Sequence, residues 1–445
     1  MAAAFVSWPS APLTESLVKR ALSNLPVSIV TSLPGTHECL RLLQWSTYDA
    51  IDHDLTHRNP DHVLSSSYTI RKALIRKHYL ARCIHSYLTK HLDSVLKDAV
   101  PRTWDLEISY ADELDEMWSD QLWDLGNEID SSSQWWILKP GMADRGMGIR
   151  LFNSKDSLYQ IFEEFEEYSE DEDQTNDTSV IISQLRHFVI QEYIPCPLLL
   201  DPTEKSPSGS VLKLPENLQG HKFHLRAYFV ASGALKLFMY DRVLALFRCR
   251  SDDDDVIPGN VDLTPHLTNT SLQIDRGEEG VHLLDELSGC YILSGDDTDR
   301  RALRLFTPED IENIKVQMGA VLAETFKAAV EMPIHFQPLP NAFELYGVDF
   351  VVSHDPTPLR PGLDSLGNSR MFQVKLLEIN SEPAIELTGR RLHGILEDLF
   401  VAIEQVAVLP FFTQEVGREP STEVLVVPRH LRKCLDIKVR GSGGW

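Results

Sequence analysis

The short apolar segment Val374–Asn380 constrains the fold and the function of this chain more than any other feature. It carries Glu378 and Asn380 two residues apart in a strand pattern. Because side chains alternate along a strand, both oxygen donors point to one face, roughly 6.5–7 Å apart at the backbone. Asp349 ends a similar apolar run, and we expect it to face them from a neighbouring strand. Buried carboxylates need a partner, and Mg²⁺ takes one or two carboxylates together with substrate phosphates. The trio predicts a magnesium site, whereas any one of these acids alone is also explained by a strand end that meets water.

Length and charge exclude several classes of protein. The chain has 445 residues, too many for one ordinary core, so two or three subdomains are expected. Its 42 Lys and Arg against 66 Asp and Glu give a net charge of −24, which opposes binding to nucleic acid or to anionic membranes. No apolar run reaches the roughly 18 residues of a membrane-spanning helix. The first residues lack a secretory pattern, and the six cysteines include no Cys-x-x-Cys pair. We therefore expect a cytoplasmic protein with no nucleic-acid or membrane partner.

Two charged segments stand out in the first half. Apolar residues at three- and four-residue steps predict one helix over Ile70–Val95, ended by Pro101. Its polar side is basic and is most simply a solvated face; the residues are Arg71, Lys72, Arg76, Lys77, Arg82 and Lys90. In the block 163–173, eight of eleven residues are acidic. Since like charges repel, we expect this block to be a solvated or disordered surface insertion.

Two further patterns indicate anion binding. Strands at Trp135–Leu138 and Ile149–Phe152 flank a loop with Gly146 and Gly148, directly after Lys139. Backbone amides of such a loop can cover phosphates while the lysine holds one, but a plain hairpin turn explains the pattern equally well. In the strand from Lys222 to Tyr228, alternation places Lys222, His224 and Arg226 on one face. A solvent-facing strand would look the same.

Taken in order, these segments resemble the tubulin–tyrosine ligase family of ATP-grasp amide ligases. Seven blocks between Tyr68 and Phe411 carry the resemblance. They are Tyr68-Thr-Ile-Arg71-Lys72, Trp136-Ile-Leu-Lys139-Pro with Gly146-Met-Gly148-Ile, Gln191-Glu-Tyr193-Ile-Pro-Cys-Pro197, Lys222-Phe-His-Leu-Arg226, His266-Leu-Thr268-Asn269, Phe343-Glu-Leu-Tyr-Gly347-Val-Asp349, and Leu377-Glu378-Ile-Asn380-Ser-Glu-Pro383. His224 departs from the family pattern, which usually has Asp there.

The resemblance implies an α+β ATP-grasp fold with ATP held between its last two domains. The expected division is an N-terminal α/β domain over 1–66, a central domain over 67–196, a C-terminal domain over 197–415 and a tail over 416–445. The family implies ATP and Mg²⁺ as cofactors. Metal ligands would be Asp349, Glu378 and Asn380. Nucleotide contacts would come from Lys72, Lys139, Gly146, Gly148, Gln191, Glu192, Tyr193, Ile194, His266, Thr268 and Asn269. The catalytic cations would be Lys222 and Arg226, with Arg226 holding the acceptor carboxylate or acyl phosphate.

The implied reaction joins a free amino acid to a carboxylate of a protein or peptide acceptor, with the tubulin C-terminal tail as one candidate. Addition of glutamate or glycine, or a non-tubulin acceptor, is the alternative within the enzyme class. A catalytically weak nucleotide-binding scaffold or interaction module is the alternative from another class. The amino acid and the acceptor are not specified by the sequence. An acidic tail needs local cations on a chain of net charge −24, and the basic helix together with Lys222, Arg226 and Arg242 would have to supply them.

Overall fold

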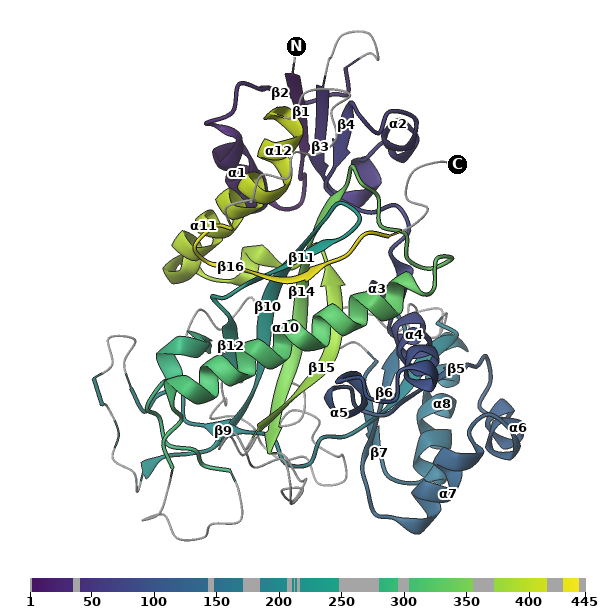
Figure 1. The fold of residues 1–445 in the computed structure, drawn as a ribbon. Helices are drawn as coiled ribbons and strands as arrows, with labels where there is room; N and C mark the ends of the chain where they lie inside the picture. Colours follow the sequence, from purple (N-terminus) through teal and green to yellow (C-terminus); the bar gives the residue numbers. More distant parts are fainter. Residues whose placement is uncertain are drawn as a thin grey trace.

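The computed structural model describes residues 2–34, 41–142, 148–170, 185–205, 210–211, 213, 217–247, 280–294, 304–354, 372–413 and 427–439. Within them the strands form three sheets, one of four strands near the N-terminus, one of eight strands in the middle and one of four strands beside it (Figure 1). No helix in these ranges is both long and apolar enough to cross a membrane.

The N-terminal sheet is parallel and has the order β2-β1-β3-β4. Its strands are β1 (Ala2–Ser7), β2 (Ser28–Val30), β3 (Arg41–Ser46) and β4 (Val63–Ser65). The crossovers contain α1 (Pro12–Leu22), which has proline in its first turn, and α2 (His53–Arg58), which Asp52 caps. All six residues of β3 are buried, as expected for a strand inside a parallel sheet.

The large sheet is antiparallel and is built around β10 (His221–Ser232). This strand pairs with β14 along one side and with β11 and β12 along the other. The remaining strands extend the sheet outward from these. The strands are β9 (Leu199–Leu200), β11 (Lys236–Tyr240), β12 (Leu244–Phe247), β13 (Val281–Leu283), β14 (Phe343–His354), β15 (Phe372–Ser381) and β16 (Leu431–Asp436).

Two cores cover the two faces of the large sheet. One face packs against the long helix α10 (Pro308–Val330), which begins at a capping box formed by Thr307 and Asp310. The other face packs against α1 and α11 (His393–Ile403), so the N-terminal sheet rests on the same body. A π-helical turn (Glu404–Val408) and α12 (Leu409–Thr413) follow α11. Figure 1 shows α10 and α11 on either side of the sheet.

The third sheet has the antiparallel order β5-β8-β6-β7. Its strands are β5 (Thr103–Glu107), β6 (Trp136–Pro140), β7 (Arg150–Phe152) and β8 (His187–Glu192). One face is closed by α6 (Glu113–Ser119), α7 (Trp123–Ser131) and α8 (Lys155–Glu170). Trp136, Leu138 and Ile190 point into that core, so the alternate residues of β6 and β8 point to the opposite face. The expected hairpin of β6 and β7 is present, and Gly148 at its end has a φ of 71°, a conformation that favours glycine.

The single helix expected over Ile70–Val95 is wrong. The chain forms α3 (Lys72–Ile75), α4 (Lys77–Lys90) and α5 (Leu96–Ala99), with an extended residue at Arg76 (φ −106°, ψ 117°). This break turns the first residues of α4 toward the loop after β6, where the amide of Lys77 donates to the carbonyl of Gly141. The basic stripe is therefore not one solvated face, since Arg71 is buried and pairs with Glu344.

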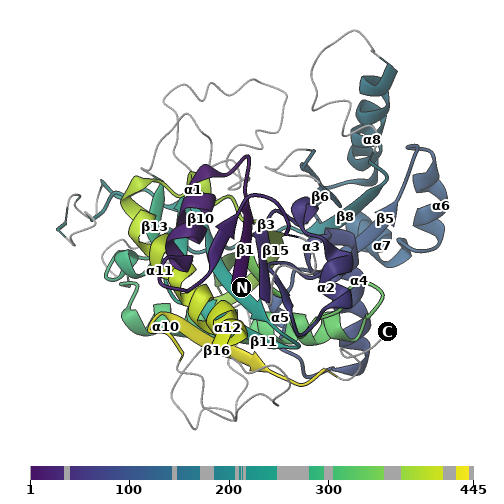
Figure 2. The ribbon, with the colours of Figure 1, turned by 90° about the horizontal axis from the view of Figure 1, so that it is seen from above.

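The acidic block 163–173 also differs from expectation. Residues 163–170 are the last turns of α8, and residues 171–173 lie outside the described ranges. Phe162 and Phe165 are buried and pack with Phe188, because their spacing places both on the inner side of the helix. Glu163 and Glu164 beside them are exposed, so this part of the block is the outer face of a helix rather than an insertion. Figure 2 shows α8 at the periphery of the molecule.

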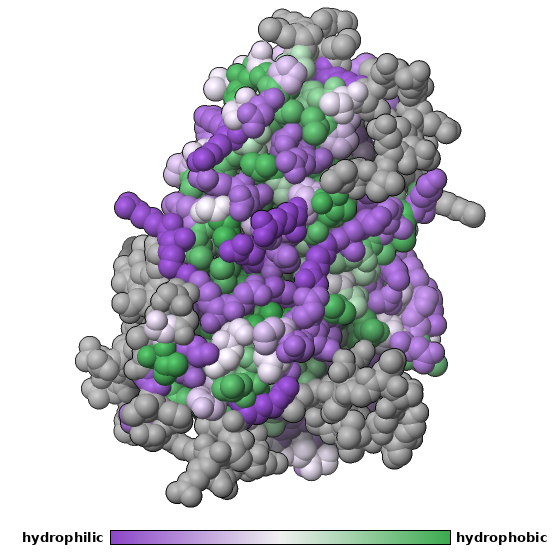
Figure 3. Space-filling model, turned by 60° about the vertical axis from the view of Figure 1, so that its left-hand side comes forward, coloured by the Kyte–Doolittle hydropathy of each residue, from purple (hydrophilic) through white to green (hydrophobic). Residues whose placement is uncertain are grey.

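The segment expected to be a C-terminal tail is also partly built into the body. Within 416–445, β16 pairs with β11 at the edge of the large sheet, and Leu435 lies in the core beneath α10. On the face drawn in Figure 3, polar side chains predominate and apolar ones are scattered among them.

Candidate active site

Three strands of the large sheet bring the expected acids together. Arg226 on β10 lies directly opposite Asp349 on β14, and Asp349 lies directly opposite Glu378 on β15. The guanidinium of Arg226 binds Asp349 through two hydrogen bonds, Nε to Oδ1 at 2.5 Å and an η nitrogen to Oδ2 at 2.8 Å. Asn380 Nδ2 lies 3.3 Å from both Asp349 Oδ2 and Glu378 Oε1. The strand alternation read from the sequence is thus confirmed, and the acids form a row across the sheet.

A glycine makes room for this row. Gly347 lies opposite Asn380 in the register of β14 and β15. A Cβ atom at this position would lie 2.6 Å from Cβ of Pro383 and 3.3 Å from Cδ of Arg226. A larger residue would therefore push the Arg226 side chain or the strand after β15 away from the acids.

Cations surround the two carboxylates from three elements. Nζ of Lys77, at the start of α4, lies 3.1 Å from Glu378 Oε2. Lys139 at the end of β6 is buried, and its charge interacts with both acids and with Lys77 and Lys222. With Lys222 and Arg226 on β10, four cationic side chains meet two carboxylates. The cluster carries a formal surplus of positive charge within a chain whose net charge is −24.

Burial and these charges shift the pKa values of the group. Burial acts to raise the pKa of Glu378, but the ammonium groups of Lys77 and Lys139 hold it far below its usual range. Burial raises the pKa of Asp349 to about 6, against the opposing effect of Arg226. Burial also lowers the pKa of Lys139 and that of Lys222, each to about 8. At neutral pH both carboxylates are ionised, and Lys139 and Lys222 are close to losing their protons.

The wall contributed by the third sheet holds Lys139 in place. Its Nζ donates to Oε1 of Gln191 at 2.6 Å, and Nε2 of Gln191 donates to Oγ1 of Thr103 at 3.0 Å. Lys139, Gln191 and Thr103 line a pocket together with Lys77 and with apolar residues of α4 and β15. This pocket lies on the face of the sheet turned away from α7 and α8, as the alternation along β6 and β8 requires.

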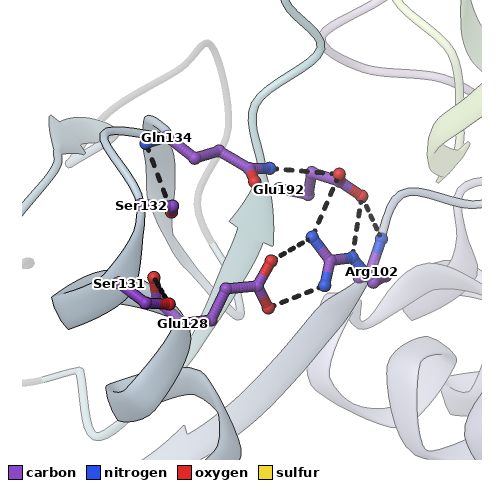
Figure 4. A network of polar contacts seen from close by, with 6 residues as sticks. All are labelled: Arg102, Glu128, Ser131, Ser132, Gln134 and Glu192. Carbon is purple, nitrogen blue, oxygen red and sulfur yellow. Dashed lines mark hydrogen bonds and ion pairs between the residues drawn. The ribbon is translucent and has the colours of Figure 1, made fainter.

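The segment 191–194, called the hinge below, is the part of this sheet that the family resemblance assigns to nucleotide contacts, and an arginine fixes it. Arg102 makes two hydrogen bonds of 2.7 Å to the carboxylate of Glu128, and its guanidinium also contacts Glu192 (Figure 4). Gln134 donates to Glu192 as well, at 3.1 Å. The side chain of Glu192 is thus engaged, and its backbone amide donates to the carbonyl of Arg102 at 2.9 Å. The neighbouring Tyr193 ring lies 4.9 Å from Nζ of Lys222, which links this hinge to β10.

Of the remaining predicted site residues, some join the cluster and some do not. Gly148 ends the loop after Lys139, and Ile194 follows Tyr193 at the hinge. Lys72 is exposed at the start of α3, where its charge acts on His335. Gly146, His266, Thr268 and Asn269 lie outside the described residues. Sequence reasoning missed Lys77, because a continuous helix would have kept it on a solvated stripe; the break at Arg76 carries it to Glu378 instead.

The donor set fits Mg²⁺. Asp349, Glu378 and Asn380 offer two carboxylates and an amide within one hydrogen-bonded group, and Mg²⁺ is held by such oxygens together with phosphates and water. Each carboxylate oxygen has two acceptor sites, so Arg226 leaves acceptor capacity on Asp349. Within the described part of the chain, no group of three His, Cys, Asp or Glu side chains could hold a metal ion. A cation here would therefore depend on the amide and on substrate phosphates.

Comparisons with known proteins agree with this geometry. The sequence model of the tubulin–tyrosine ligase family matches residues 55–416. A probable tubulin–tyrosine ligase of Saccharomyces cerevisiae, PBY1, is 35% identical over 431 residues, which cover 91% of this chain and 51% of that protein. The chain thus spans about half the length of this relative. A probable tubulin–tyrosine ligase of Schizosaccharomyces pombe is 34% identical over 408 residues, which cover 87% of each chain.

A solved structure resembles the chain over nearly its whole length. It is the C-terminal domain of K. lactis Pby1, described as an ATP-grasp enzyme that interacts with the mRNA decapping enzyme Dcp2. The TM-score is 0.62 at 30% identity, and the match covers 98% of this chain and 99% of that one. The mixed helix and sheet architecture is therefore the expected ATP-grasp fold. Since the family model also matches most of the sequence, this chain belongs to the tubulin–tyrosine ligase family.

Proposed function

We propose that the protein is an ATP-dependent ligase that joins a carboxylate of a protein acceptor to the amine of a free amino acid. One observation carries the proposal: four cations from α4, β6 and β10 surround two ionised carboxylates on β14 and β15. A surplus of buried positive charge suits a polyphosphate, and the acids suit the metal that accompanies it.

In this reaction an oxygen of the acceptor carboxylate attacks the γ-phosphorus of ATP, and ADP leaves. The amine of the amino acid then attacks the carbonyl carbon of the acyl phosphate. Inorganic phosphate leaves, the amine gives up a proton, and an amide bond remains. Phosphoryl transfer of this kind depends mainly on positioning and charge stabilisation. Lys77, Lys139 and Lys222 would hold the phosphates, and Arg226 would hold the acceptor carboxylate or the acyl phosphate.

Mg²⁺, held by Glu378, Asp349 and Asn380, would neutralise negative charge on the phosphates during transfer. Arg226 stabilises Asp349 in its ionised form through their two hydrogen bonds. The strand register then keeps both acids on the same side of the sheet as Arg226 and Lys222.

We propose the tubulin C-terminal tail as the acceptor, because the two yeast relatives are named probable tubulin–tyrosine ligases. The cations that could attract an acidic tail are fewer than the sequence suggested. Lys77, Lys222 and Arg226 lie in the cluster, but Arg71 is turned to Glu344. An acidic peptide would be attracted only locally, and its binding should weaken steeply as salt rises.

The test is to incubate the purified protein with MgATP, each labelled amino acid in turn, and candidate acceptors that include tubulin tail peptides. The proposal predicts ADP release that depends on both amino acid and acceptor, together with incorporated label. Label from glutamate or glycine alone would identify the addition of those amino acids. ATP binding without any incorporation would favour the nucleotide-binding scaffold.

An interaction role is a second candidate, favoured by the solved structure that covers 98% of this chain and is described as interacting with the mRNA decapping enzyme Dcp2. We propose the corresponding decapping enzyme as a partner. Co-purification of the two expressed proteins would support this role, and their separation on a sizing column at micromolar concentration would argue against it.

A further inference from the structure

His224 is a buried member of the cluster whose ring nitrogens lack a hydrogen-bond partner within the described part of the chain. It lies on β10 between Lys222 and Arg226, and its side chain is 1% exposed. Neither ring nitrogen has a hydrogen-bond partner among the described residues. The nearest carboxylate oxygen, Oδ1 of Asp349, is 3.9 Å from Nε2, beyond hydrogen-bonding distance.

Burying an imidazole without hydrogen bonds costs free energy unless a ligand supplies the missing partner. A buried polar group without a hydrogen bond costs on the order of 1–3 kcal/mol. Its neighbours on the same face of β10, Lys222 and Arg226, are both cationic, so the imidazole lies in a polar row and not in the apolar core that begins at Tyr228. A ligand bound in the cluster could form hydrogen bonds with the ring nitrogens, so this cost would be removed only in the ligand-bound protein.

The position of His224 indicates which part of a nucleotide it would meet. The ring is beside Asp349, Arg226 and Glu378, at the acid end of the cluster, whereas Gln191 and the hinge at Tyr193 lie toward the third sheet. The acid end is where the metal and phosphates are placed by the proposed function. An imidazole keeps at least one N–H in each of its protonation states, so it can always donate to a phosphate oxygen. The aspartate usual in the family accepts only.

Resting on the proposed function, we propose that His224 donates a hydrogen bond to a phosphate oxygen of bound ATP, a nucleotide contact that the family's usual aspartate cannot make. His224 would then distinguish nucleotides by their phosphates and not by base or sugar. Because it takes the place of an acid, it also leaves the cluster with one negative charge fewer to repel the triphosphate.

The experiment compares the affinities of the full-length protein for MgATP and for adenosine, which lacks phosphates, by calorimetry or competition. His224→Leu removes the donor, and a hydrogen bond to a charged group lost from a buried site predicts MgATP binding about 10- to 100-fold weaker. Adenosine affinity should stay within about 2-fold. His224→Asp should weaken MgATP binding further, since a carboxylate repels phosphate.

Two amide variants keep the test informative. His224→Asn carries an N–H near the position of Nδ1, and His224→Gln carries one near Nε2, so rescue of MgATP affinity by one of them identifies the donating nitrogen. Melting temperatures check that each variant folds. Wild-type affinity for MgATP in His224→Leu, or an equal loss for ATP and adenosine, would overturn the inference. Failure of the wild-type protein to bind MgATP at all would instead overturn the proposed function, and this inference with it.

Discussion

Strand β14 carries two buried acids that pair with buried arginines in different ways. Glu344 and Asp349 lie five residues apart and therefore point to opposite faces of the sheet. On one face, Glu344 accepts hydrogen bonds from Arg71, from the amide of Tyr68 and from the hydroxyl of Tyr346. On the other face, Asp349 accepts from Arg226 and Asn380 beside three buried or half-buried lysines and an imidazole without a partner.

This difference distinguishes a structural ion pair from a ligand-binding site. The Glu344 group is closed, because its charges are matched and its oxygens are used; it ties the start of the central segment to β14. The Asp349 group has surplus cations and an imidazole that lacks a hydrogen-bond partner among the described residues, which in a folded protein cost free energy until a ligand binds. The same two residue types, on one strand, thus support stability on one face and binding on the other.

Breaking the closed pair should have the largest effect on stability. Glu344→Gln leaves Arg71 buried without its counter-charge, which should cost about 3–5 kcal/mol of unfolding free energy. Urea denaturation measures this loss. Glu331→Gln is the matched control, because Glu331 pairs with Lys90 and His91 at the surface and should lose less than about 1 kcal/mol. A loss at Glu344 no larger than at Glu331 would remove the distinction between the two groups.

Removing an acid from the open cluster should affect activity more than stability. Glu378→Gln keeps the shape of the side chain and can still accept from Lys77, but loses the charge that would hold the metal. Activity should fall at least about 100-fold, equivalent to roughly 2.7 kcal/mol. The unfolding free energy should also fall, because Lys77 and Lys139 lose a counter-charge, but the variant should still fold. The readout is ADP release under MgATP together with a urea curve. Normal turnover by Glu378→Gln would show that the reaction takes place elsewhere.

The lysines should make the open cluster sensitive to pH. Because the pKa of Lys139 and that of Lys222 are lowered to about 8, MgATP affinity should fall as pH rises above 8, about tenfold per pH unit for each lysine that must be charged. The effect of pH on stability runs in the opposite direction to its effect on affinity. Between about pH 8 and the ordinary value of 10.5, the unfolded chain holds more protons on Lys139, so this contribution to the unfolding free energy rises with pH.

Lys139→Arg is the control for this profile, since a guanidinium stays charged across the range. It should flatten part of the loss of affinity above pH 8. An affinity for MgATP that is constant from pH 7 to 9.5 in the wild-type protein would contradict the assignment of either lysine to the phosphates.

The smallest effect is expected at the hinge. Arg102 is 47% exposed, so Arg102→Ala should cost about 1 kcal/mol or less of unfolding free energy. Its removal leaves the Glu192 carboxylate with the hydrogen bond from Gln134, and Glu192 does not line the pocket beside Lys139. MgATP affinity should therefore change less than about 3-fold. A tenfold or larger loss of MgATP affinity in a titration would mean that the contacts of Arg102 with Glu128 and Glu192, drawn in Figure 4, position the nucleotide directly.

Features of this protein that depend on neighbouring residues could be predicted from the sequence, whereas those that depend on distant contacts could not. The row of Asp349, Glu378 and Asn380 was predictable because strand alternation is local and strict. The hairpin after Lys139 was predictable for the same reason. The break at Arg76 was not, because an apolar period runs through it; tertiary contacts of its neighbours, such as Ala73 with the carbonyl of His335, hold the chain in two helices. Phe165 was hidden by its acidic neighbours, since composition describes a block and burial depends on one face of a helix.

A crystal structure of the protein with Mg²⁺ and a non-hydrolysable ATP analogue tests the central claim most directly. We expect the triphosphate between β6 and β8 of the third sheet and β14 and β15 of the large sheet. Lys77, Lys139 and Lys222 should contact phosphate oxygens, and Glu378 and Asn380 should contact the metal. A triphosphate bound away from these residues, with the Arg226–Asp349 and Lys77–Glu378 pairs unchanged, would contradict it.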